Sequence, residues 1–126
     1  MANTPEGKIT DAIRKALKKM APDVWFFKIH GGPLQKAGVP DFLVVVRGVA
    51  VFLEVKQPKG KISRLQRYVK GQIRKAGGVA EVVYSDIEAQ EVIEYVKRYV
   101  DEGGRGAPRR RWKPSPSCEG TRDLPR

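Results

Sequence analysis

The sequence predicts one mixed α/β domain whose elements follow the order α-β-β-β-α-β-α. Two observations predict it. Three segments repeat apolar residues at helical spacing, and four short runs are rich in the β-branched and aromatic residues typical of strands. A chain of 126 residues is long enough for one domain with a modest core. We therefore expect a mixed sheet flanked by helices.

The first predicted helix begins after Thr4, which can cap a helix N-terminus, and Pro5 suits the first turn. Apolar side chains then recur on one face until Pro22: Ile9, Ile13, Ala16, Leu17 and Met20. Residues 24–29 (VWFFKI) predict a strand, and the glycine- and proline-rich HGGPLQKAGVP after it predicts a loop. His30 is expected to be a loop or phosphate-contacting residue, because nothing pairs with it for acid–base chemistry.

The next stretch, DFLVVVRGVAVFLEVK, predicts two strands joined by a two-residue turn at Arg47 and Gly48. Beyond it, Ser63 with Gln66 fits a capping box, followed by a helix that ends at Gly77 and is expected to bury Leu65, Val69, Ile73 and Ala76. A strand is predicted over residues 79–84. A last helix, capped by Ser85 with Glu88 and ending near Gly103, is expected to bury Val92, Ile93, Val96 and Val100.

Charge and composition narrow the class of function. Lys and Arg total 25 against 14 Asp and Glu, and a net charge of +11 favours a polyanionic partner, with a membrane surface as the rival interpretation. A single cysteine, Cys118, excludes an internal disulfide, and a single histidine excludes a Cys/His zinc cluster. The N-terminus resembles no signal peptide and no apolar run approaches a membrane span, so we expect a cytoplasmic protein.

Composition changes after Glu102, where residues 103–126 mix Gly, Pro, Ser and Arg without any period. Such a composition indicates a tail without fixed structure. The tail carries seven Lys/Arg and two acids, a net charge of +5, and residues 1–102 keep +6. Affinity for nucleic acid should therefore not reside in the tail alone.

The predicted hairpin brings charged residues together. If Val46 pairs with Val49 across the turn, paired residue numbers sum to 95, and Asp41 faces Glu54 on one side of the sheet. Two carboxylates opposed in this way, with Cβ atoms about 5 Å apart, repel each other. Alternation along the strand places Lys56 on the same side as a partial compensator. Mg²⁺ or Mn²⁺, which prefer hard oxygen ligands, would compensate more strongly.

Two further side chains are candidates for this site. Glu6 falls near the middle of the apolar stripe of the first helix, and an inward carboxylate needs a partner, so it could complete a metal site with Asp41 and Glu54. Gln66 could orient a water, a phosphate or a carboxylate, or serve only as a cap partner. Each acid also has a simpler explanation, because acids at strand ends are commonly solvated and one in a first helical turn favours the helix dipole. Lys56 could likewise be an ordinary surface base.

The pattern G-V-P-D (38–41) followed by E-V-K (54–56) resembles the PD-(D/E)xK nuclease motif. More narrowly, Glu6 in the first helix, GVPDFLVV, FLEVKQPKGKIS, Gln66 and AGGVAEVVYS resemble the virus-type replication-repair nuclease domain, VRR-NUC, over about residues 4–100. The resemblance implies a restriction-endonuclease-like fold for residues 1–102. It also implies active-site roles for Asp41, Glu54, Lys56 and Gln66, with Glu6, Asp41 and Glu54 as metal ligands, and leaves the tail outside the pattern.

By this resemblance the protein would be a Mg²⁺- or Mn²⁺-dependent DNA endonuclease that hydrolyses phosphodiester bonds. Small stand-alone members of such families often act as homodimers on branched DNA, which implies four-way (Holliday) junctions in replication and repair as substrates. Two alternatives stay open. One is a non-catalytic basic module that binds nucleic acid. The other is a restriction-type nuclease specific for a sequence, although no element that would read bases in a groove is evident.

Overall fold

The computed structural model describes residues 4–30 and 37–116, and its elements follow the predicted order. They are α1 (Pro5–Lys19), β1 (Val24–Lys28), β2 (Phe42–Val46), β3 (Val49–Val55), α2 (Arg64–Lys75), β4 (Val79–Val83) and α3 (Asp86–Asp101). The predicted α/β class with a mixed, helix-flanked sheet is confirmed, and it is consistent with a restriction-endonuclease-like fold. Among the described residues, no helix is long and apolar enough to cross a membrane.

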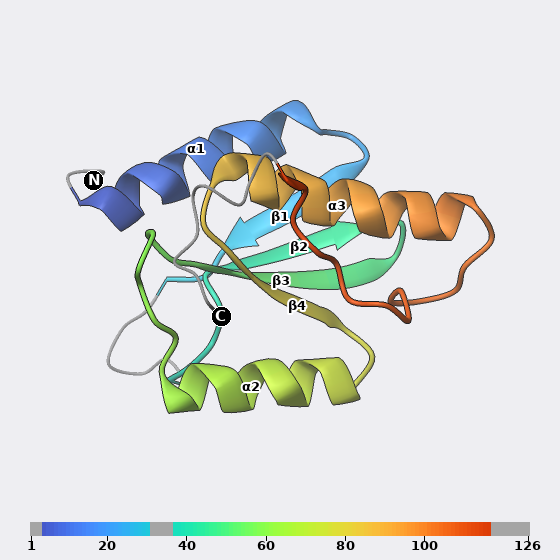
Figure 1. Ribbon diagram of the computed structural model, residues 1–126. Coiled ribbons are helices and arrows are strands. Elements are labelled where there is room, and N and C mark those ends of the chain that lie inside the picture. Colours follow the sequence, from blue (N-terminus) through green and yellow to red (C-terminus); the bar gives the residue numbers. More distant parts are fainter. Residues whose placement is uncertain (1–3, 31–36, 117–126) are drawn as a thin grey trace.

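The four strands form one sheet in the order β1-β2-β3-β4. The pairs β1–β2 and β2–β3 are antiparallel, whereas β4 lies parallel to β3 because the chain crosses back through α2. Helices α1 and α3 lie together on one face of the sheet, and α2 lies on the other (Figure 1). The face with two helices is therefore well covered, whereas α2 covers mainly the β4 side of its own face.

The β2–β3 hairpin has the predicted register, with Val46 opposite Val49 and Phe42 opposite Leu53. Its turn residues Arg47 and Gly48 have φ angles of 51° and 77°, the left-handed pair that a type I′ hairpin turn requires. Ion pairs from the Arg47 guanidinium to Asp23 and Asp101 support this strained position. The turn thus fixes which residues meet at the far end of the two strands.

Buried side chains alternate along the strands and form one core beneath α1 and α3. Even-numbered residues of β2 and odd-numbered residues of β3 face this core, as the two-residue period of a strand requires. Their partners from the helices include Ile13, Leu17, Val92, Ile93 and Val96. On the α2 side, the side chains of Trp25 and Phe27 in β1 and Val45 in β2 stay exposed, because none of the three described helices covers these strands there.

The helix ends show where local sequence signals hold. Thr4 caps α1, and Ser63 with Gln66 forms the complete capping box of α2. Ser85 caps α3, but the Glu88 side chain accepts a hydrogen bond from the Tyr84 amide and is fully buried. The predicted inner face of α2 is only partly correct. Val69 is buried, whereas Leu65 and Ala76 are exposed because they lie in the first turn and at the end of a helix that packs mainly on β4.

The segment after α3 corrects the predicted lack of structure for residues 103–116. Trp112 is buried in the core, and the Tyr95 hydroxyl donates a hydrogen bond to the carbonyl of Arg110. The Ser115 amide donates to the carboxylate of Glu91. One aromatic anchor and these bonds fix a segment whose average composition is typical of disorder. Residues 117–126, including Cys118, lie outside the described residues.

Candidate active site

The candidate site lies at the end of the β2–β3 ladder away from the turn. The Asp41 amide donates to the Leu53 carbonyl at 3.0 Å, which continues the register one step beyond β2. The Asp41 carboxylate accepts a hydrogen bond from the Val55 amide at 2.7 Å, so its side chain is directed across the ladder. Asp41 therefore lies opposite Glu54, as the hairpin register predicts. Both side chains are on the α2 side of the sheet.

Glu54 is a buried carboxyl group with an unusual electrostatic environment. Only 6% of the residue is exposed, and burial, the charge of Asp41 and a hydrogen bond with the Asp41 carboxyl raise its pKa to about 8. Lys56 acts in the opposite direction, with its Nζ 4.0 Å from Glu54 Oε2. Without a further cation, burial and the charge of Asp41 therefore favour the protonated form of the Glu54 carboxyl. The predicted repulsion between the opposed acids contributes to this increase, because the charge of Asp41 raises the pKa of Glu54.

Gln66 has both of the roles that the sequence left open. Its Oε1 accepts the Ser63 amide at 2.8 Å as part of the capping box, and its Nε2 donates to Glu54 Oε2 at 2.9 Å. The cap holds the Gln66 side chain in one position, and the amide then fixes the Glu54 carboxyl. The start of α2 thus orients a residue of the site.

Glu6 lies beside this group in the first turn of α1 and is half-buried. Burial raises its pKa, with Asp41 adding to the increase, whereas Lys56 and Lys28 oppose it. Within residues 4–30 and 37–116, no three or more His, Cys, Asp or Glu side chains are grouped closely enough to hold a metal ion. The structure therefore brings Asp41, Glu54, Lys56 and Gln66 together, and Glu6 interacts with them electrostatically without joining such a group.

Sequence reasoning missed Lys28. Its Nζ donates to the Ile29 carbonyl at 2.8 Å and lies 5.8 Å from the centre of the Phe42 ring, and its charge lowers the pKa of Glu6. The signal that could have found it is the pairing of Lys28 with Phe42, next to Asp41. That pairing joins strands separated by a long loop, so no turn type fixes its register. His30 is exposed just beyond β1.

The donor set fits a hard divalent cation. Asp41 and Glu54 offer carboxylate oxygens from opposite strands, and burial together with the charge of Asp41 raises the pKa of Glu54. A divalent ion would replace the shared proton, as metal binding to acidic ligands does. Glu6 would contribute a third acid from α1. Oxygen ligands of this kind suit Mg²⁺ and Mn²⁺ equally.

The α-β-β-β-α-β-α order with a mixed, helix-flanked sheet is consistent with the restriction-endonuclease-like class of folds, and Asp41, Glu54 and Lys56 lie together at one end of the sheet. No family model matches the sequence, and no curated protein matches it. Among solved structures, a chain described as a VRR_NUC domain is similar with a TM-score of 0.61 and 28% sequence identity, covering 73% of this chain and 97% of that chain. The resemblance to the VRR-NUC domain is thus confirmed and supports a nuclease domain here.

Proposed function

We propose that this protein is a metal-dependent DNA endonuclease that hydrolyses phosphodiester bonds. The observation that carries the proposal is the Asp41–Glu54 pair, with Lys56 at 4.0 Å from Glu54 and Gln66 fixing it from α2. This arrangement lies at the end of the β2–β3 ladder away from the hairpin turn. The net charge of +11 supports a nucleic-acid substrate.

Each residue has a proposed role in the reaction. A bound Mg²⁺ or Mn²⁺ supplies positive charge to the scissile phosphate and lowers the pKa of the attacking water. Asp41 and Glu54 would hold this ion, with Glu6 as the third acidic group. Lys56 either holds the attacking water or stabilises the negative charge that develops on the phosphate. Gln66 is a positioning residue, because it acts through the Glu54 carboxyl.

A panel of labelled substrates tests the activity. We expect cleavage of DNA with Mg²⁺ or Mn²⁺ and none with EDTA, and stronger cleavage of four-way junctions than of flap, nicked or plain duplex DNA. Binding without cleavage under every metal condition would refute the nuclease and favour a non-catalytic basic module. Cleavage at fixed sequences in plain duplex would instead favour a restriction-type enzyme.

We further propose that the protein acts as a homodimer on branched DNA. Symmetric resolution of a junction requires two cuts, and a two-fold dimer supplies two sites in related orientations. The support is the apolar surface on the α2 side of the sheet, where Trp25 is 60%, Phe27 52% and Val45 37% exposed. Trp25 and Val45 are paired neighbours, so these side chains form one patch on an edge strand and its neighbour.

Light scattering at micromolar concentration tests the dimer. We expect the wild-type protein to be a dimer, and Trp25→Arg to give a monomer that still cleaves plain duplex DNA but no longer makes paired cuts in a junction. Ile87→Arg is the matched control, because Ile87 is 51% exposed on α3, on the other side of the sheet. A monomeric wild-type protein that makes single nicks would remove the dimer and leave the metal-dependent nuclease intact.

A further inference from the structure

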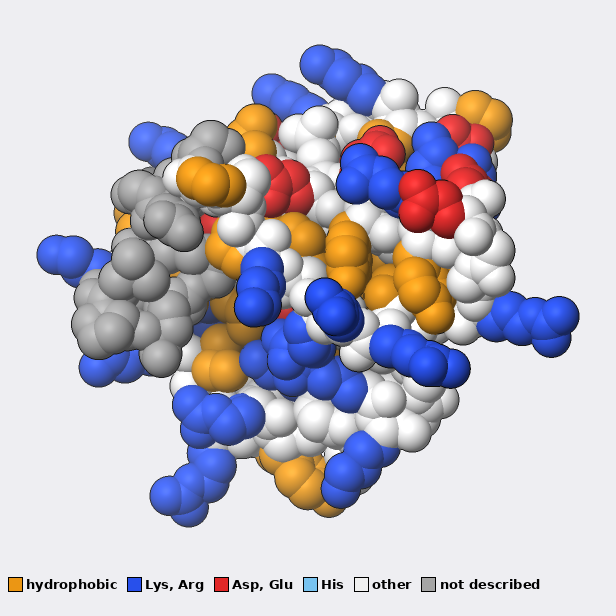
Figure 2. Space-filling view, turned by 45° about the vertical axis from the view of Figure 1, so that its right-hand side comes forward, with side chains coloured by type: hydrophobic (Ala, Val, Ile, Leu, Met, Phe, Trp, Pro, Cys, Tyr) orange, Lys and Arg blue, Asp and Glu red, His pale blue; other side chains and the backbone are white. Residues whose placement is uncertain are grey.

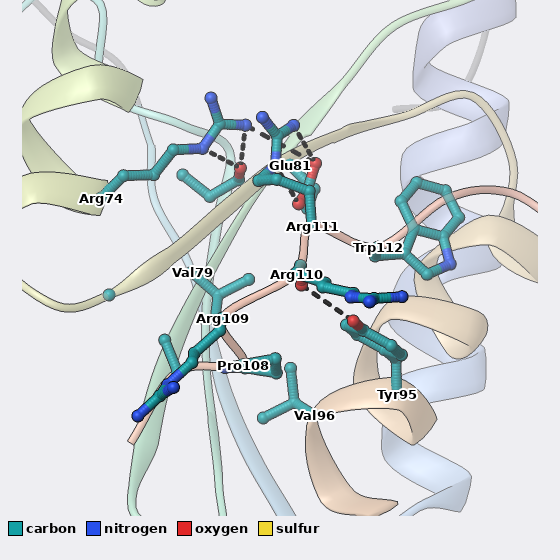
Figure 3. A pocket seen from close by; sticks show the side chains of 13 residues that line it. Arg74, Val79, Glu81, Tyr95, Val96, Pro108, Arg109, Arg110, Arg111 and Trp112 are labelled. Carbon is teal, nitrogen blue, oxygen red and sulfur yellow. Dashed lines mark hydrogen bonds and ion pairs between the residues drawn. The ribbon is translucent and has the colours of Figure 1, made fainter. Parts of the chain in front are cut away.

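A second charged cluster lies around Glu81, which is 5% exposed in β4, the strand at the opposite edge from β1. The Arg111 guanidinium, from the segment after α3, donates two hydrogen bonds to the Glu81 carboxylate at 2.9 and 2.7 Å. Arg74 of α2 lies 3.6 Å from the same carboxylate, and its guanidinium donates to the Ala80 carbonyl. Figure 3 shows both guanidinium groups side by side at Glu81.

This cluster has more positive than negative charge. Burial lowers the pKa of Lys70, and the charges of Arg74 and Arg111 lower it further, although Glu81 opposes them. The pKa of Arg74 is lowered by burial and then by Arg111. Arg74 and Arg111 contact the Glu81 carboxylate directly, and the hydrogen bond to Glu81 raises the pKa of Arg111. With Lys70 nearby, three cations surround one acid. An anion bound here would supply the missing negative charge.

The cluster borders a cavity of about 190 Å³ between β4, α3 and the segment after α3. Arg74 and Glu81 lie on one side of the cavity, with residues 107–112 along the other. The volume is below the roughly 300–1,000 Å³ of ordinary small-molecule pockets, so the cavity suits a single anionic group better than a whole nucleotide. Arg110, also at the cavity, is directed toward Tyr95 and Trp112, whereas Arg109 points away from Glu81 (Figure 3).

Helix α2 links this cavity to the candidate active site. Gln66, Lys70 and Arg74 follow one another at four-residue intervals, so they lie on one side of the helix. Lys70 and Glu81 also line a small hollow together with Glu54 and Gln66. Eight residues of helix span about 12 Å, which equals about three to four phosphates of a duplex strand measured along its axis. Figure 2 shows Lys and Arg side chains gathered in the middle of the molecular surface that it displays, above the position of α2 in Figure 1.

We propose that the cavity at Arg74 and Arg111 binds a backbone phosphate of the DNA substrate, about three to four phosphates from the bond that is cleaved. The inference rests on the proposed nuclease function and names a contact outside its active site. Glu81 holds the two arginines in place when DNA is absent and competes with the phosphate for Arg111. Lys70 lies on the path between the two sites.

DNA binding in EDTA, where cleavage is not expected, tests the site. We expect Arg111→Gln to weaken binding by about tenfold, the range of a charged hydrogen bond, and to lower the salt dependence by about one released ion. Arg105→Gln is the matched control, because Arg105 is exposed in the same segment and does not line the cavity. Equal effects of Arg111→Gln and Arg105→Gln would overturn the proposal.

Glu81→Gln distinguishes phosphate binding by Arg111 from a purely structural role of the Glu81–Arg111 ion pair. We expect it to tighten binding by about threefold more than Glu94→Gln, because it frees Arg111 while Glu94→Gln removes the same charge from an exposed site on α3. Loss of folding would weaken binding, so tighter binding cannot arise from it. If Glu81→Gln and Glu94→Gln bind alike, the cavity is not a phosphate site.

Single neutral methylphosphonates placed along one strand locate the contact. We expect the wild-type protein to lose affinity at a position about three to four phosphates from the cleaved bond, and Arg111→Gln to be insensitive there. Normal cleavage with no such position would overturn this inference alone. Failure of the wild-type protein to bind or cleave DNA at all would overturn the proposed function as well.

Discussion

Two buried glutamates on neighbouring parallel strands have opposite surroundings. Glu54 in β3 and Glu81 in β4 are 6% and 5% exposed, and each faces a different side of the sheet. Glu54 lies beside Asp41 and near Glu6, with one lysine at 4.0 Å, and its pKa is raised to about 8. Glu81 receives two hydrogen bonds from Arg111 and an ion pair from Arg74.

The difference shows that burial alone does not mark a functional carboxylate. Burial disfavours the charged form of either side chain, but arginines compensate Glu81, whereas a second acid increases the cost at Glu54. The protein completes one site with its own cations and leaves the other in need of a proton or a metal ion. The sign of the neighbouring charges therefore separates the candidate catalytic acid from the acid of the basic cluster.

The largest expected effect is the loss of cleavage when either acid of the Asp41–Glu54 pair is replaced. We expect Glu54→Gln and Asp41→Asn each to lower the rate of metal-dependent cleavage by at least about 10³-fold, because each removes a proposed ligand. Asn is preferred at position 41, since its side-chain oxygen can still accept the Val55 amide. Single-turnover cleavage of a labelled junction measures the rate.

Glu81→Gln is the matched control for this prediction, because it changes an equally buried glutamate on the next strand. It should retain cleavage within a few-fold of wild type, and Glu54→Gln and Asp41→Asn should still bind DNA. Wild-type rates for Glu54→Gln, or equal losses for the two glutamate variants, would remove the distinction between the two regions.

The second prediction concerns residues 103–116, the segment that brings Arg111 to Glu81. A chain that ends at residue 102 lacks Arg111 and Trp112, so we expect its free energy of unfolding to fall by about 3–5 kcal/mol, the range for removing a buried large aromatic side chain. A chain that ends at residue 116 keeps both and should be more stable than the chain that ends at residue 102. Urea denaturation of the three chains measures this, and equal stability would show that residues 103–116 do not support the fold.

Most of the fold could be predicted because its signals are local. The type I′ turn at Arg47 and Gly48 fixes one hairpin register, and Thr4, Ser63 and Ser85 cap the three helices as predicted. Residues 103–116 could not be predicted in this way. Their order depends on Trp112 reaching a core formed by distant elements, and composition alone does not report such a contact.

The part of the candidate site that depends on local signals could also be predicted, and the part that depends on packing could not. Asp41, Glu54 and Lys56 follow from the hairpin register and strand alternation, which are short-range rules. Glu6 and Lys28 reach the site from α1 and β1, so their positions depend on how these elements pack. The basic cluster at Glu81 joins β4, α2 and the segment after α3, and no spacing in the sequence relates Arg74 to Arg111.

A smaller effect should follow from Lys56→Arg, which we expect to slow cleavage by about 10- to 100-fold while DNA binding persists. A guanidinium is planar and larger than the compact ammonium, and Lys56 is mostly covered, with 16% of its side chain exposed. Lys61→Arg is the matched control, because Lys61 is exposed in the loop before α2. A normal rate for Lys56→Arg would show that the site needs only a positive charge at this position.

The smallest expected effect is the part of the pH dependence of stability that Glu54 contributes. Its pKa is about 8 in the folded protein against 4.5 in the unfolded chain, so the folded state keeps a proton that the unfolded state releases between these values. The free energy of unfolding should therefore fall as pH rises from about 5 to 8, by about 1–2 kcal/mol after allowance for solvent screening. Urea denaturation in EDTA at several pH values, compared between wild type and Glu54→Gln, measures the contribution of Glu54 together with its coupling to the neighbouring acids. Added Mg²⁺ should flatten the slope in the wild type by replacing the proton. A difference between wild type and Glu54→Gln that stays constant with pH would show that Glu54 is ionised in the folded protein, and the contrast between the two glutamates would then rest on geometry alone.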